Sequence, residues 1–123
     1  MSRTPVVSII DDDESIRNTM SSLVRSLGYD ALTFDSAEAF LASPRLDETS
    51  CLILDVQMSG MSGLDLQDEL RTCNYTVPII FITAFPDEAL RHRAEAAGAL
   101  GFFGKPVDGQ IIIACLNKAV QNS

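Results

Sequence analysis

The sequence predicts an α/β fold in which a parallel sheet is covered by helices on both faces. Short apolar runs rich in β-branched residues alternate with segments of helical periodicity, and this alternation occurs five times along the chain. The apolar runs at 6–10, 51–54 and 79–82 are nearly continuous, as expected for strands that are buried on both sides. We therefore expect residues 1–123 to form one doubly wound (βα)5 domain.

Local signals set the boundaries of the predicted elements. The first helix ends at Gly28, because glycine accepts the left-handed backbone of a helix C-terminus. Pro44 stops the second helix, Ser62 caps the third, Pro78 opens the fourth strand and Gly98 ends the fourth helix. The predicted strands are 6–10, 30–34, 51–54, 79–82 and 101–103. The predicted helices are 14–27, 36–41, 63–71, 87–97 and 108–121.

Composition and charge exclude several classes of function. With 46% apolar and 21% charged residues, the chain has the composition of a soluble globular protein. No apolar run approaches the roughly 20 residues that span a membrane, and no signal peptide is visible, so we expect a cytoplasmic domain without a membrane partner. The net charge of −8 lacks the basic face that phosphate backbones require, so we expect no direct nucleic-acid binding.

Polar side chains follow four of the five predicted strands at their carboxyl ends. Asp11 and Asp12 follow the first strand and Asp55 the third. Thr83 follows the fourth strand and Lys105 the fifth. Ligands of open parallel α/β sheets bind outside the carboxyl ends of the strands, so we expect these side chains to meet there.

Carboxylates gathered at one edge indicate a cation site. They repel one another, and a hard cation such as Mg²⁺ relieves that repulsion while keeping water positions open to a phosphate oxygen. An ionised Asp55 beside the metal is then a nucleophile that forms an acyl phosphate. Lys105 supplies positive charge and Thr83 a hydroxyl donor for the phosphoryl oxygens.

Simpler structural roles compete for some of these residues. Asp13 or Glu14 is assigned to capping the first helix, where acids are favoured, but four acids in a row exceed what a cap needs. A single aromatic such as Phe102 in a short strand serves the core more often than a switch. His92 lies between arginines in a polar helix, so we interpret it as a surface residue and not as a phosphate carrier.

The matching segments, taken together and in order, identify a family. They are Ile10-Asp11-Asp12, Leu54-Asp55-Val56-Gln57-Met58, Gly60-Met61-Ser62-Gly63, Ile82-Thr83-Ala84, Gly98-Ala99 and Phe102-Phe103-Gly104-Lys105-Pro106. Each is weak alone, but their order and separations are specific. The chain resembles the receiver domain of a bacterial two-component response regulator over essentially its whole length. The resemblance implies a flavodoxin-like parallel sheet of order 2-1-3-4-5.

The resemblance also implies a phosphoacceptor and a metal site. Asp55 matches the phosphorylated aspartate and would also hold the metal, and Asp12 matches the direct Mg²⁺ ligand. Asp11 matches the second acid of the metal site, which in the family usually contacts the metal through a water molecule. Gln57 would contribute its backbone carbonyl to the metal, for which Mn²⁺ could substitute.

Further residues match the switch of the family. Thr83 matches the hydroxyl that turns toward the phosphoryl group, and Lys105 matches the lysine that contacts it. Phe102 matches the aromatic that moves inward when Thr83 moves, and the bond before Pro106 is expected to be cis. Ser59 departs from the family, because proline usually stands there and would restrict the loop.

The resemblance predicts a signalling switch and not a turnover enzyme. A sensor histidine kinase would donate the phosphoryl group, and a partner-binding face would respond. A phosphatase-like hydrolase is the second hypothesis, but Gln57 stands where such enzymes place an acid/base. The third is a binding module that never needs phosphate. Segment 58–67 is similar to receivers of the FixJ type, which usually precede a DNA-binding domain, so we expect a transcriptional output. Both an excised receiver and a single-domain regulator fit the sequence.

Two predictions concern surfaces beside the site. The three consecutive isoleucines 111–113 cannot all face the core of one helix, so at least one is expected to be exposed. With Phe102 nearby, Ile111 indicates a homodimer face on the fourth helix, fifth strand and fifth helix, although scattered surface apolar residues are ordinary. Phe85 is expected to shield the acyl phosphate from water. Gln57 is expected to tune the hydrolysis of the acyl phosphate by orienting a water molecule.

Overall fold

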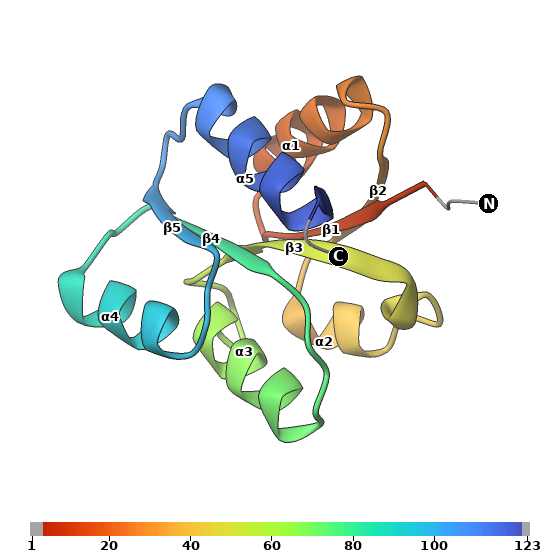
Figure 1. The fold of residues 1–123 in the computed structure, drawn as a ribbon. Helices are drawn as coiled ribbons and strands as arrows, with labels where there is room; N and C mark the ends of the chain where they lie inside the picture. The colour runs from red at the N-terminus through yellow and green to blue at the C-terminus, as the bar shows by residue number, and fades with distance from the viewer. Residues whose placement is uncertain (1–3, 122–123) are drawn as a thin grey trace.

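The computed structural model describes residues 4–121 and contains one parallel sheet of order β2-β1-β3-β4-β5, which confirms the predicted architecture (Figure 1). The strands are β1 (Val6–Ile10), β2 (Asp30–Phe34), β3 (Thr49–Asp55), β4 (Ile79–Thr83) and β5 (Gly101–Gly104). The helices are α1 (Glu14–Ser26), α2 (Ala37–Leu41), α3 (Gly63–Thr72), α4 (Glu88–Ala96) and α5 (Gly109–Gln121). No helix among the described residues is long and apolar enough to cross a bilayer.

The sheet separates two layers of core. Helices α1 and α5 cover one face, and α2, α3 and α4 cover the other (Figure 1). Successive side chains of β3 alternate between these layers, because strand side chains point to opposite faces. Leu52 and Leu54 pack toward α2, α3 and α4, whereas Cys51 and Ile53 pack toward α1 and α5. Burial on both faces explains why the sequences of the central strands are continuous apolar runs.

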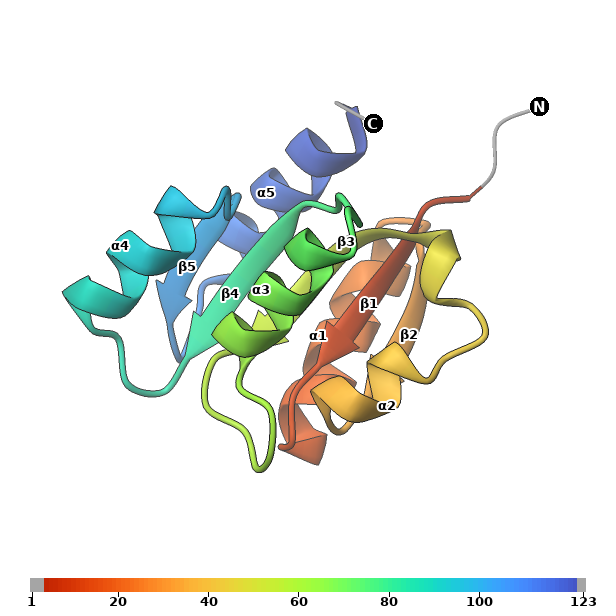
Figure 2. The ribbon, with the colours of Figure 1, turned by 90° about the horizontal axis from the view of Figure 1, so that it is seen from below.

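The register of the strands brings their carboxyl ends to one edge. Ile10 at the end of β1 pairs with Leu54, the residue before Asp55. Thr83 at the end of β4 pairs with Gly104, the residue before Lys105. Figure 2 shows the arrowheads of β1, β4 and β5 directed toward this edge.

The boundaries differ from the predictions by a few residues. β3 begins at Thr49 and includes Asp55, and α4 begins one residue after Asp87, whose carboxylate caps it by accepting from Ala89 N at 2.7 Å. A 3₁₀ helix at 46–48 was not predicted, because three residues show no periodicity. Ile111 is 43% exposed while Ile112 is fully buried, which confirms that the three isoleucines do not share one environment.

Candidate functional site

Three acids and one lysine meet at the carboxyl edge of the sheet. Asp11 lies directly after β1 and is fully buried, and Asp55 ends β3 with 3% of its surface exposed. Lys105 Nζ lies 2.9 Å from Asp11 Oδ2 and 3.5 Å from Asp55 Oδ1. Asp12 is exposed beside them. The structure therefore brings together side chains from the carboxyl ends of three strands, β1, β3 and β5.

Backbone hydrogen bonds fix two of these residues on their strands. Asp11 N donates to Phe34 O at 3.1 Å, which continues the pairing of β1 with β2 by one residue. Lys105 N donates to Thr83 O at 2.7 Å, which holds the lysine beside the end of β4. The peptide bond between Lys105 and Pro106 is cis, as the resemblance implied.

Asp11 and Asp13 have different structural partners. Asp11 Oδ1 accepts from Asp13 N at 2.9 Å, and the guanidinium of Arg17 donates to Asp11 O at 2.8 Å. Asp13 Oδ1 accepts from Ser15 N at 2.9 Å and caps α1, so Asp13 takes the capping role of the acidic run. The hydroxyl of Ser15 also donates to Asp13 Oδ1 at 2.9 Å, and this bond, together with the one from Ser15 N, lowers the pKa of Asp13. Asp11 is thereby aimed inward, toward Asp55 and Lys105.

The electrostatics of this edge favour the binding of a cation. Burial and the charge of Asp11 raise the pKa of Asp55 to about 6, against the opposing charge of Lys105. Burial acts to lower the pKa of Lys105, but its bond to Asp11 and the charge of Asp55 outweigh burial and leave that pKa raised. The single positive charge of Lys105 therefore does not fully neutralise the negative charge of the neighbouring carboxylates.

The oxygen atoms of these acids fit a hard metal ion. Asp11, Asp12 and Asp55 each offer one carboxylate oxygen, and these atoms lie within 4.8 Å of one another. The buried Oδ2 of Asp11 is paired with the Lys105 ammonium at 2.9 Å. An all-oxygen donor set of this kind suits Mg²⁺, which takes few protein carboxylates and keeps several waters.

Gly63, which belongs to one of the matching segments, and Glu38, which sequence reasoning did not single out, shape the loop after Asp55. Gly63 N donates to Val56 O at 2.9 Å, and a Cβ at Gly63 would collide with the backbone carbonyl oxygen of Asp55. Glu38 of α2 accepts from Met61 N at 3.0 Å, and that hydrogen bond lowers the pKa of Glu38. The loop without the family's usual proline is therefore held from α2 by a carboxylate.

Thr83 is connected to Gln57 across the site. Its buried Oγ1 donates to Gln57 Oε1 at 2.5 Å and accepts from Phe85 N at 3.1 Å. The Gln57 side chain is exposed. The sequence suggested separate roles for these three residues but carried no signal that they bond to one another.

Phe102 and Phe85 lie in different environments. Phe102 is half-buried, and its ring centroid lies 6.1 Å from that of Phe81, so it packs on the core layer that α4 covers. Phe85 is 71% exposed. Shielding of Asp55 by Phe85 stays a prediction for the phosphorylated state.

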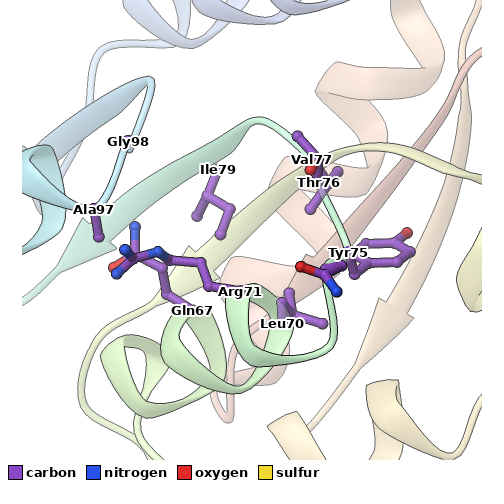
Figure 3. Close-up of a pocket in the computed structure, with 10 residues that line it drawn as sticks. Gln67, Leu70, Arg71, Tyr75, Thr76, Val77, Ile79, Ala97 and Gly98 are labelled. Carbon is purple, nitrogen blue, oxygen red and sulfur yellow. The ribbon is translucent and has the colours of Figure 1, made fainter.

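A hollow in the surface lies away from the acids. It has a volume of about 380 Å³ and lies between the C-terminal ends of α3 and α4, near the start of β4. Figure 3 shows the side chains of Gln67 and Arg71 extending toward Ala97 across this hollow. It opens near Ile79, the first residue of β4, and therefore at the edge opposite Asp55.

A five-stranded parallel sheet of this order, with acids and a lysine at its carboxyl edge, defines a response regulator receiver domain. Residues 7–117 match that family, and the chain belongs to it.

Among its relatives is Nodulation protein W of Bradyrhizobium diazoefficiens, which is 43% identical over 108 residues, 88% of this chain and 48% of that protein. Transcriptional regulatory protein FixJ of Azorhizobium caulinodans is 34% identical over 95% of this chain and 56% of its own length. A solved structure of the response regulator StyR superimposes with a TM-score of 0.88 at 40% identity, covering 97% of this chain and 60% of StyR. The chain thus spans about half the length of the curated relatives it matches, and the FixJ-like assignment is confirmed.

Proposed function

We propose that this receiver domain is a switch that is phosphorylated on Asp55. The observation that carries the proposal is the convergence of Asp55 with Asp11, Asp12 and Lys105 at one sheet edge. A buried carboxylate beside two further acids and one lysine is poorly explained as a structural ion pair, because the acids outnumber the cation. The same arrangement suits the transfer of a phosphoryl group, in which positioning and charge neutralisation dominate.

The chain's own residues account for the steps of the transfer. A carboxylate oxygen of Asp55 attacks phosphorus, and the P–N bond of a phosphohistidine donor breaks with its electron pair returning to the imidazole nitrogen. Lys105, already 3.5 Å from Asp55, stays paired with the acyl phosphate formed. Asp11, Asp12, Asp55 and the backbone carbonyl of Gln57 would hold Mg²⁺, which when bound neutralises the phosphoryl oxygens.

The switch proceeds from Thr83 to a distant face. The new phosphoryl charge attracts the Thr83 hydroxyl, and Phe102 repacks as Thr83 leaves its resting position. A face on α4, β5 and α5 that includes Phe102 and Ile111 then changes its affinity for a second copy of the domain. The donor is a sensor histidine kinase, and the name of the FixJ relative supports a transcriptional output.

The site disfavours repeated hydrolysis of a phosphate ester. Aspartyl-phosphate hydrolases place a second acid two residues after the nucleophile, and this chain has Gln57 there, which has no titratable group. Its amide oxygen is moreover occupied by Thr83. Slow loss of the phosphoryl group by water attack remains compatible with the site, whereas steady turnover is not.

The test is covalent modification. Acetyl phosphate is added with Mg²⁺ or with EDTA, and intact mass is measured for wild type and Asp55→Asn. We expect one phosphoryl adduct on wild type with Mg²⁺, little adduct in EDTA and none on the variant. An unmodified wild type, or an equally modified variant, would refute the proposal. Equal partner affinity of wild type and Asp55→Ala would instead support a phosphate-independent binding module.

A further inference from the structure

We propose that the side chain of Gln57 is a positioning residue that holds Thr83 in the resting state and thereby sets the threshold of the switch. The inference rests on the proposed function, because a resting position has meaning only if Thr83 later turns to a phosphoryl group on Asp55. It assigns to the amide of Gln57 a role separate from that of its backbone carbonyl.

The hydrogen bonds of Thr83 carry the inference. A hydroxyl group has one proton to donate. In this structure the proton of Thr83 goes to Gln57 Oε1 at 2.5 Å, while Phe85 N supplies a proton to the same Oγ1 at 3.1 Å. Thr83 therefore has no further proton for a phosphoryl oxygen, and donation to Asp55 requires that the bond to Gln57 breaks.

The two ends of this bond differ in their access to water. Thr83 is fully buried, so its hydroxyl depends on protein partners in the resting state. The Gln57 side chain is exposed, and its amide is readily solvated after release. Breaking the bond therefore leaves neither of its two ends buried without a partner once Thr83 has a phosphoryl oxygen to donate to. The Thr83–Gln57 bond can therefore break and re-form as the phosphoryl group is added and lost.

The backbone places Gln57 beside Thr83 without help from the bond itself. Val56 N donates to Ile82 O at 3.2 Å, and Val56 O accepts from Gly63 N at 2.9 Å. The residue before Gln57 is thus tied on one side to β4, one residue before Thr83, and on the other to the start of α3. The amide of Gln57 consequently starts close to the hydroxyl and loses little freedom on binding it.

The expected strength follows from the type of bond. A hydrogen bond between neutral groups shifts an equilibrium by roughly twofold to tenfold after water is considered. Removal of the Gln57 amide should therefore raise the population of the other Thr83 rotamers by about that factor. A bias of this size changes the resting population of Thr83 measurably, and a phosphoryl group on Asp55 can still overcome it.

The test uses unphosphorylated protein in EDTA and a pair of variants with side chains of similar length. Gln57→Met removes the amide oxygen, and Gln57→Glu retains an acceptor oxygen. Rotamer populations of Thr83 are measured by NMR from three-bond couplings to its γ-methyl carbon, and exchange of the Phe85 amide proton is followed in parallel. We expect the methionine variant to redistribute the rotamers and to speed Phe85 exchange, and the glutamate variant to resemble wild type.

Unchanged rotamers and exchange in Gln57→Met would overturn the inference, as would a glutamate variant that behaves like methionine. The readout needs no phosphoryl transfer, so failure of Asp55 to accept phosphate would refute the proposed function without altering this result. A second arm adds acetyl phosphate and Mg²⁺ to wild type. If intact mass shows the adduct, Thr83 should leave its resting rotamer, and retention of that rotamer would also contradict the inference.

Discussion

Replacement of Asp55 by asparagine should stabilise the metal-free protein at neutral pH. The wild-type carboxylate is buried beside Asp11, and its pKa is raised from the ordinary 3.8 to about 6. Because one pKa unit corresponds to about 1.4 kcal/mol, ionised Asp55 costs the folded state about 3 kcal/mol relative to the unfolded state. Asparagine has a similar shape and no charge, so it removes this cost.

The pH range of the effect follows from the two pKa values. Below the unfolded pKa of 3.8, Asp55 is protonated in both states and the two proteins should be equally stable. As pH rises toward about 6, the unfolded state releases its proton while the folded state retains it, so wild type loses stability. Above that pH the difference is constant, and Asp55→Asn should be the more stable protein.

Urea unfolding in EDTA between about pH 4.5 and 8 measures this difference. With a slope of about 2 kcal/mol per molar urea, the midpoint of the variant should lie roughly 1.5 M above that of wild type at pH 7.5. Asp12→Asn is the matched control, because Asp12 is an exposed acid at the same edge and its replacement should change the midpoint little. Added Mg²⁺ should then stabilise wild type more than Asp55→Asn.

Equal stabilities of wild type and Asp55→Asn across this pH range would refute the reasoning. A variant that is less stable at pH 7.5 would show that the pair of Asp55 with Lys105 contributes more than burial and the charge of Asp11 cost.

Three further predictions concern Lys105, Gly63 and Phe85. Lys105→Met removes the cation beside two buried carboxylates, so we expect a loss of about 3 kcal/mol at pH 7 in urea unfolding, shrinking toward pH 5 as Asp55 protonates; a loss independent of pH would contradict this origin. Gly63→Ala should destabilise by about 2–3 kcal/mol because its Cβ meets the Asp55 carbonyl oxygen, whereas Gly109→Ala, whose Cβ would meet Leu23 at 3.8 Å, should not, and equal midpoints for the two variants would exclude the collision. Phe85→Ala should shorten the lifetime of the phosphoryl adduct measured by intact mass, and an unchanged lifetime would count against shielding.

The sequence by itself determined the architecture and the edge at which the acids meet. Continuous apolar runs predict strands that are buried on both faces, and alternation with helices predicts a parallel sheet. In such a sheet all strands end at one edge, so residues that directly follow strands are brought together whatever their separation in sequence. This is why Asp11, Asp55 and Lys105 lie together. Their proximity could be predicted without knowing how the side chains pack.

Only the tertiary structure decided how those groups interact. The raised pKa of Asp55 depends on its burial and on its separation from Asp11, neither of which periodicity describes. The hydrogen bond of Thr83 to Gln57 and that of Met61 to Glu38 each join separate loops or elements. A sequence pattern predicts the position of a backbone, but a hydrogen bond depends on atoms placed within a few tenths of an ångström. That precision comes from packing the whole sheet and its helices, and it is the level at which the resting state of the switch is set.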